Sequence, residues 1–236
     1  KKISNQSKPK VYVATPCYGD IKIETMVSLL DTFSTLGGSG IEAKFKTVKT
    51  SLVTHGRNLL TCGFMDSGFD YMLFVDADVE FKPEAVLRML VPKKNIISFL
   101  ISFFLSKYQN NIKILPWDLV EITEGPAGLM MIHRSVFEKL MKDYPKLKIE
   151  FPKGSRALMN EEIGASSDAI DKYMYNFWDT SFKDQLWKGE DLAFCNLATE
   201  AGFKIYANLA SQTTHHGPWG WTGTFGDSLT KKEEKQ

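Results

Sequence analysis

Short apolar runs alternate along the first half of the chain with longer segments in which apolar residues recur every three or four positions. The runs predict strands at 11–15, 41–48, 71–75 and 96–105. The longer segments predict helices at 21–36, 52–67 and 84–90. Strands that alternate with helices build a mostly parallel sheet flanked by helices, so we expect an α/β fold in a single domain.

The first strand and the helix after it have recognisable boundaries. Pro16 is expected to end the strand. The next helix is inferred from apolar residues at helical spacing, and Gly37 and Gly38 are expected to stop it. Those apolar residues are Ile23, Met26, Val27, Leu30 and Phe33.

The second half of the chain is less regular. It predicts strands within 117–132, around a turn at Gly125–Gly128, and another at 203–207. Helices are expected at 135–141 and 190–201. Residues 151–185 have no clean period, and a segment of that length is a functional flap or carries short helices.

Two segments lie where a ligand is expected to bind. In open α/β sheets, ligands bind beyond the carboxyl ends of the strands. This rule points to residues 15–18 and to residues 76–78, each directly after a predicted strand.

Asp76 and Asp78 form a pair of carboxylates around Ala77 at the end of the apolar strand 71–75. Residues i and i+2 of an extended chain share a face, and two anions side by side are costly without a cation between them. Mg²⁺ or Mn²⁺ would meet that need and would also hold a diphosphate. The alternative is that the pair caps a turn or the following helix.

Five blocks, read together, resemble the glycosyltransferases of the GT-A fold, which is Rossmann-like and carries a D-x-D motif. Residues 69–79 resemble the D-x-D strand, and 55–60 resemble the Arg-Asn helix start that precedes it. Residues 125–137 are similar to the glycine turn, apolar strand and helix start that follow. Residues 189–195 resemble the E-D-x-x-F-C helix, and 215–217 match the closing H-x-G. The resemblance implies a catalytic domain over 9–222, with tails at 1–8 and 223–236.

The resemblance also implies a donor site. It assigns Thr15, Pro16 and Tyr18 to the nucleotide, while an ordinary turn between strand and helix is the alternative for that segment. Arg57 is expected either to bind the nucleotide or to orient Asp76, unless it is a surface arginine.

Glu190 and Asp191 stand at the start of the helix predicted at 190–201. Both head stripes of apolar residues, so they lie at the top of the core-facing side. Acids also favour the first turn of a helix for electrostatic reasons, which is the structural alternative. The resemblance makes Asp191 the general base that deprotonates the acceptor, and gives Glu190 a role in orienting that acceptor.

A histidine beside Asp76 and Asp78 would complete a metal shell, and the resemblance to the closing H-x-G makes His215 that ligand, with His216 as the alternative and a purely structural histidine as the other reading. Among the five tryptophans, Trp178 and Trp219 are candidates to stack on a sugar ring, although core packing is the default for the residue type.

The composition of the chain limits its possible binding partners and its cellular compartment. Lys and Arg number 29 against 28 for Asp and Glu, and this near-neutral balance argues against a nucleic-acid partner. The three cysteines are far apart without a C-x-x-C, as in a reducing compartment. No apolar run reaches the ~20 residues of a membrane span, so we expect a cytoplasmic protein or a soluble catalytic domain cut from a longer chain.

The sequence therefore predicts a metal-dependent transferase. Its donor would be a nucleotide diphosphate sugar of the UDP or GDP type, and its acceptor a carbohydrate or another hydroxyl compound. The pairing of Glu190 with Asp191 favours inversion at the anomeric carbon. Two alternatives are an inactive relative that binds carbohydrate or nucleotide sugar, and a sugar-nucleotide nucleotidyltransferase. The latter would need a glycine-rich basic phosphate loop, which residues 15–20 lack.

Overall fold

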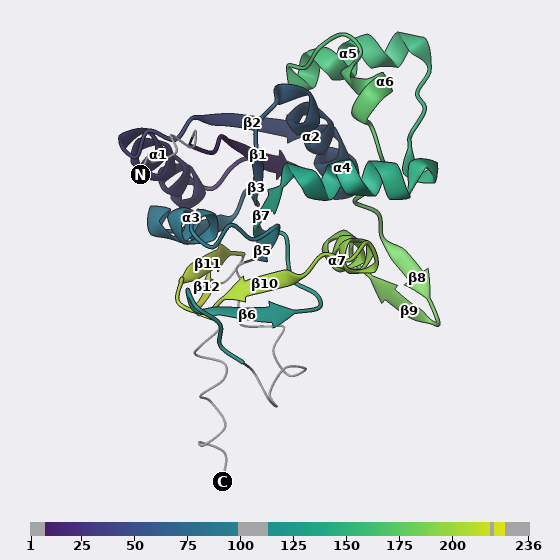
Figure 1. Cartoon of the computed structure of the whole chain (residues 1–236). Helices are drawn as coiled ribbons and strands as arrows, with labels where there is room; N and C mark the ends of the chain where they lie inside the picture. Colours follow the sequence, from purple (N-terminus) through teal and green to yellow (C-terminus); the bar gives the residue numbers. More distant parts are fainter. Residues whose placement is uncertain (1–7, 99–112, 218–219, 225–236) are drawn as a thin grey trace, which may run out of the picture.

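A computed structural model describes residues 8–98, 113–217 and 220–224 of the chain. A seven-stranded sheet forms its centre, with helices on both faces (Figure 1). Helices α1 (Ile23–Gly38) and α3 (Pro83–Leu90) pack on one face, against Val11, Val13 and Leu73. The other face is covered by α2 (Val53–Ser67), α4 (Arg134–Asp143), α5 (Lys153–Ile163), α6 (Ala169–Tyr173) and α7 (Glu190–Glu200).

The strands of the central sheet run in the order β2-β1-β3-β7-β5-β10-β6. Five of them point the same way, because β1 is parallel to β2 and β3, β5 is parallel to β10, and β7 is antiparallel to both β3 and β5. Only β6 and β7 run in the opposite direction. The bounds are β1 (Val11–Cys17), β2 (Ala43–Lys49), β3 (Tyr71–Val75), β5 (Ile96–Ser98), β6 (Leu119–Ile122), β7 (Leu129–His133) and β10 (Ile205–Asn208).

The predicted α/β class, the mostly parallel central sheet and the helical flanks are confirmed. Of the strand predicted at 96–105, the structure describes Ile96–Ser98 as β5, and the rest lies outside the described residues. The tails predicted at 1–8 and 223–236 are described only at residues 8 and 223–224.

The prediction that Pro16 ends the first strand is wrong, because Pro16 lies inside β1. The N–H of Val11 donates to the carbonyl of Glu42, on the side of β2. Backbone N–H groups of successive residues in a strand point to opposite neighbours, so the backbone nitrogen of Pro16 points towards β3. Pairing with β3 stops at Ala14. The missing N–H of Pro16 therefore costs no ladder hydrogen bond.

Helix α1 is present, but four of the apolar residues that predicted it are turned to solvent. Ile23, Met26, Val27 and Leu30 are exposed. The inner face consists of the smaller or polar residues Thr25, Ser28 and Thr32, with Leu29 and Leu36. Ser28 accepts a hydrogen bond from the N–H of Phe81 in β4 (Val79–Phe81), at 3.1 Å, so a polar side chain serves the close approach of helix to strand.

Two small sheets, which the sequence did not predict, complete the structure. Strand β11 (Thr213–His216) pairs with β4 and with β12 (Gly220–Gly223). A separate hairpin joins β8 (Ser181–Lys183) to β9 (Leu186–Lys188). The short helices expected within 151–185 are confirmed as α5 and α6.

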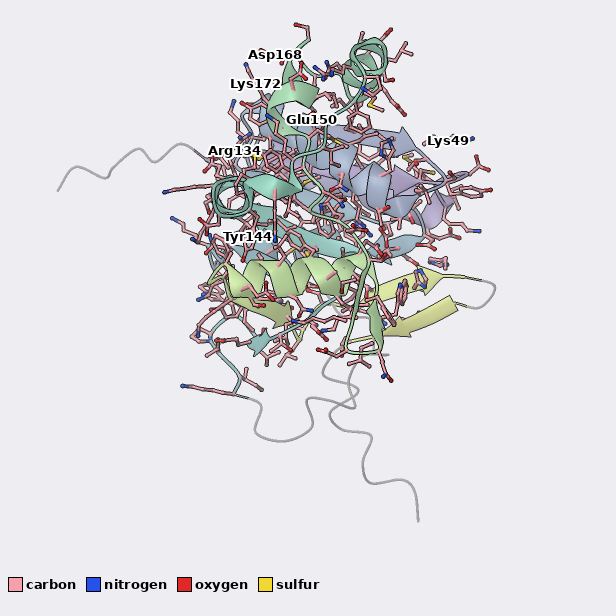
Figure 2. The ribbon with its side chains drawn as sticks, turned by 90° about the vertical axis from the view of Figure 1, so that its right-hand side faces the viewer. Lys49, Arg134, Tyr144, Glu150, Asp168 and Lys172 are labelled. Carbon is pink, nitrogen blue, oxygen red and sulfur yellow. The ribbon has the colours of Figure 1, made fainter. Side chains whose placement is uncertain are left out.

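The two ends of the strands in the central sheet differ in what they carry. Figure 2 shows Lys49, the last residue of β2, and Arg134, directly after the reversed strand β7, on opposite sides of the molecule. Arg134 donates hydrogen bonds to the carbonyls of Phe64, Met65 and Phe69, and so caps the carboxyl end of α2. Arg134 therefore has a structural role at one end of the strands, and the candidate site lies at the opposite end.

The three cysteines are free and buried. Within the described part of the chain, the helices are too short or too polar for any of them to cross a membrane.

Candidate active site

A cavity of about 460 Å³ opens where β1 and β3 end. Its walls come from the β1–α1 turn, the start of α2, the segment after β3, the start of α7, and β11. The lining residues are Pro16, Cys17, Tyr18, Gly19, Asp20, Lys22, Thr50, Ser51, Val53, Arg57, Asp76, Ala77, Asp78, Glu190 and His215. Four of the five motif blocks contribute lining residues to this one cavity, although Arg57 and His215 are 158 residues apart in the chain.

Arg57 joins two carboxylates across the cavity floor. Only 2% of its side chain is exposed. Its Nη2 lies 2.8 Å from Oδ1 of Asp76, and its Nε lies 3.3 Å from Oε1 of Glu190. The guanidinium carbon lies 5.0 Å from the ring centre of Phe74 and 5.4 Å from that of Trp178. We call Arg57, Asp76 and Glu190 the arginine clamp.

The clamp leaves one donor unused. The Nη1 atom of Arg57 is buried and has no hydrogen-bond partner among the described residues. A buried donor without a partner costs free energy, so a donor of this kind in a residue that lines a cavity calls for a functional explanation. Of the two roles predicted for Arg57, the structure shows the contact with Asp76 and leaves a group available for the other.

Two glycines make room for the clamp. A Cβ atom on Gly56 would come within 2.6 Å of the Thr50 side chain, so the first turn of α2 can approach this loop only with glycine there. A Cβ atom on Gly128 would lie 3.2 Å from Oδ2 of Asp76, whose N–H donates to the Gly128 carbonyl. The glycine turn before β7 therefore gives Asp76 its space and its backbone anchor.

Asp78 and His215 form a second, more exposed pair in the cavity. His215 Nε2 lies 3.1 Å from Oδ2 of Asp78, and both side chains are partly exposed. Strand β11 brings them together, since His215 is paired with Val79 and the N–H of His216 donates to the Asp78 carbonyl. The His216 ring instead lies 2.8 Å from Glu80 and does not line the cavity.

The residues predicted as metal ligands come together only in part. Within residues 8–98, 113–217 and 220–224, no three His, Cys, Asp or Glu side chains converge as a metal-binding group. Asp76 is turned to Arg57. Asp78 and His215 nevertheless have the spacing of neighbouring ligands, because atoms held about 2.1 Å from one ion at right angles lie about 3 Å apart.

Asp191 follows Glu190 of the clamp in the first turn of α7. It is half-buried, and it accepts a hydrogen bond from the N–H of Leu192 at 2.8 Å. Burial raises the pKa of its carboxyl group, and the neighbouring Glu190 raises that pKa further. Glu190 lines the cavity wall, whereas Asp191 is not among the lining residues.

The predicted nucleotide-binding segment is divided by burial. Pro16, Tyr18 and Ala77 line the cavity, and Tyr18 is strongly exposed at its rim. Thr15 is fully buried and does not line the cavity.

The prediction that Trp178 stacks on a sugar is wrong. Its side chain is 0% exposed, and its ring stacks on Phe194 with centres 4.1 Å apart. Its indole N–H donates to Thr61 at 3.0 Å. Trp178 is a core residue that supports Arg57 from below. Trp219 lies outside the described residues.

Two contributors were missed in the sequence. Asn58 accepts a hydrogen bond from the N–H of Trp178 and donates to Asn176, so it fixes the 176–178 segment beside the clamp. Lys22 lines the cavity, and its N–H donates to the Ala77 carbonyl. The Arg57-Asn58 dipeptide was the available signal for Asn58, whereas nothing marked Lys22.

The cavity carries more negative than positive charge. Four carboxylates line it, from Asp20, Asp76, Asp78 and Glu190, against the two cations of Lys22 and Arg57. An anionic ligand such as a diphosphate therefore needs an additional cation here.

No protein-family model matches this chain, and no curated protein matches it. Among solved structures, A197 from STIV is 16% identical over 88% of this chain and 86% of its own, with a TM-score of 0.46. A glycosyltransferase involved in the glycosylation of the major capsid of PBCV-1 is 11% identical, over 71% and 76%, with a TM-score of 0.33. The 4-diphosphocytidyl-2C-methyl-D-erythritol synthase from Anaerococcus prevotii is 10% identical, over 67% and 85%, with a TM-score of 0.33.

Similarity at these identities and TM-scores carries no argument about activity. The function of this chain has to be argued from the chemistry of its own cavity.

Proposed function

We propose that this chain is a glycosyltransferase that moves a sugar from a nucleotide diphosphate sugar to a hydroxyl acceptor. The observation that carries the proposal is the arrangement around Arg57. One buried guanidinium holds both Asp76, beside which the diphosphate would lie, and Glu190, the neighbour of Asp191. Donor and acceptor groups would thus meet over one fixed floor.

The donor side suits a divalent cation. Mg²⁺ and Mn²⁺ are commonly held by one or two carboxylates together with substrate phosphates and water. Asp78 and His215 would supply the protein ligands, while Asp76 stays paired with Arg57. When bound, the cation would neutralise charge on the leaving diphosphate. Tyr18 offers a ring at the cavity rim for the base of the nucleotide.

The acceptor side suits proton removal. A hydroxyl group that attacks the anomeric carbon must lose its proton, and a carboxylate with a raised pKa is suited to accept it. Burial and the charge of Glu190 raise the pKa of Asp191 in this way. Arg57 already holds Glu190 in an ion pair, so Glu190 is less suited to be the base and would instead orient the acceptor. A base that deprotonates the acceptor for direct attack on the anomeric carbon suits transfer with inversion.

The test is the variant Asp191→Asn, which keeps size and hydrogen bonding but removes the base. Sugar transfer is expected to fall by about 10²–10⁴-fold, the usual contribution of a general base. Binding of UDP or GDP in the presence of Mn²⁺, measured by calorimetry, should not change. Glu200→Gln, at the exposed end of the same helix α7, is the matched control and should keep full transfer.

Three results would contradict the proposal. Near-normal transfer by Asp191→Asn would remove Asp191 as the base. Absence of nucleotide binding with any divalent metal would remove the donor site. Release of pyrophosphate from a nucleoside triphosphate and a sugar phosphate would identify a nucleotidyltransferase instead.

A further inference from the structure

The β8–β9 hairpin exposes two large aromatic side chains on one face. Phe182 is 74% exposed and Trp187 is 68% exposed. They are directly paired across the two strands, so their side chains lie on the same face. Leu186, 64% exposed, is the neighbour of Trp187 and therefore lies on the opposite face. We call Phe182 and Trp187 the aromatic pair.

The hairpin that carries the pair has a defined geometry. Its two turn residues, Asp184 and Gln185, have φ values of 53° and 62°, as in the tight turns whose twist matches paired strands. At its other end, Lys188 forms an ion pair with Glu124. Figure 1 shows the hairpin standing out from the body beside α7. It is thus a small, anchored projection and not an irregular loop.

The hairpin leads straight into the candidate catalytic helix. Gly189 alone separates Lys188 from Glu190, the first residue of α7. Three residues span at most about 11 Å, so Trp187 starts within that distance of Glu190. The pair therefore lies within a few residues of Glu190, which lines the cavity.

We infer that the aromatic pair is a carbohydrate-binding subsite and that the acceptor is a glycan. This inference rests on the proposed function, which requires a hydroxyl compound beside Asp191. A sugar ring has an apolar C–H face and a hydroxyl rim. An exposed aromatic ring complements that apolar face. The pair thereby takes the role that the sequence assigned to Trp178.

A second copy of the chain or a lipid surface would also cover apolar groups. The aromatic face of the hairpin presents only two large side chains, which is too small a surface for either. Trp187 lies three residues before Glu190 in the chain, which favours an occupant that extends from the cavity that Glu190 lines.

Binding of free oligosaccharides tests the inference without any need for transfer. Maltotriose, chitotriose, mannotriose and lactose would be examined as probes by saturation-transfer NMR on the full chain. At least one should bind, and Trp187→Ala should weaken that binding by about tenfold. Trp187→Phe should restore most of it, because the ring face is kept. Leu186→Ala, on the opposite face of the same hairpin, is the matched control and should bind as the parent does.

The outcomes separate this inference from the proposed function. If donor binding with Mn²⁺ is intact but none of the probes binds, or if Trp187→Ala and Leu186→Ala behave alike, the subsite is overturned and the donor site stands. If probes bind through Trp187 but no nucleotide binds, the subsite stands and the transferase proposal fails. A dimer of the parent chain in light scattering that Trp187→Ala makes monomeric would assign the pair to self-association.

Discussion

The arginine clamp and the Asp78–His215 pair lie in one cavity, yet they hold charge in opposite ways. The clamp is closed, because Arg57 is buried and contacts Asp76 and Glu190 at the same time. The second pair is open, with both side chains partly exposed and a single contact of 3.1 Å. A buried pair resists exchange because separating it leaves uncompensated charge, whereas an exposed pair contributes little and is easily replaced.

This difference separates architecture from exchangeable chemistry. The clamp keeps the cavity floor in place whether or not a ligand is present. Asp78 and His215 lose little when they release each other, so they are the groups that an incoming cation would recruit. The predictions that follow challenge this division from its largest expected effect to its smallest.

Removing the clamp cation should have the largest effect. Arg57→Met keeps much of the apolar contact with Phe74 and Trp178 but leaves Asp76 and Glu190 without a partner. The free energy of unfolding is expected to fall by about 3 kcal/mol, as when one partner of a buried ion pair is lost. Urea unfolding measures it.

Arg57→Lys separates charge from geometry in the same experiment. Lysine restores the charge but not the planar fork that contacts two carboxylates, so it should recover only part of the loss. A loss below 1 kcal/mol in Arg57→Met would mean that the clamp is not architectural.

Removing the open carboxylate should affect ligand binding and not the fold. For the parent chain, a nucleotide diphosphate with Mn²⁺ at about 100 times its dissociation constant should add ~2.7 kcal/mol to stability. Asp78→Ala should lose most of that gain while its unliganded melting temperature stays close to the parent value. Asp31→Ala, an exposed carboxylate on α1, is the control. Unchanged metal-dependent stabilisation in Asp78→Ala would remove Asp78 from the metal site.

The two adjacent histidines provide a smaller and sharper contrast. His215→Ala should weaken binding of Mn²⁺ with nucleotide by about tenfold, or ~1.4 kcal/mol. His216→Ala removes only the contact with Glu80, worth at most about 1 kcal/mol of stability at a partly exposed site, and should leave binding unchanged. Titration of both variants by calorimetry measures the difference. Equal or reversed effects would assign the ligand role to His216.

The sequence predicted the elements better than their orientation. Continuous apolar runs such as 71–75 are typical of strands buried on both faces, and β3 occupies those residues. Helix α1 shows where periodicity fails, because Ile23, Val27 and Leu30 promised an apolar inner face and lie outside. Close packing of α1 against β4 favours small side chains on the buried face. The distance between a helix and a strand depends on the whole fold, so it could not be predicted from the sequence of α1 alone.

The candidate site shows a similar division. Short motifs identified Asp76, Asp78 and Glu190, because the strand end and the helix start are local features. The contact between Arg57 and Glu190 spans 133 residues, and no spacing rule reaches that far. Trp178 was misassigned because burial, which decides between packing and sugar binding, is a property of the folded chain.

The smallest expected effect on stability concerns Asp191, the neighbour of Glu190 at the start of α7. Burial and Glu190 raise its pKa above that of the unfolded chain. A carboxyl group with a raised folded-state pKa favours folding at low pH, and this contribution is lost as the pH rises through the folded pKa. Asp191→Asn removes the titration, so the variant should melt at or slightly above the parent temperature at pH 7. The difference should vanish near pH 3, where both chains are neutral at this position. Melting curves across that range measure it. A variant that melts lower at pH 7 would show that Asp191 stabilises the start of α7, as a helix-terminal acid does, and would place it with the architecture of the clamp rather than with the chemistry.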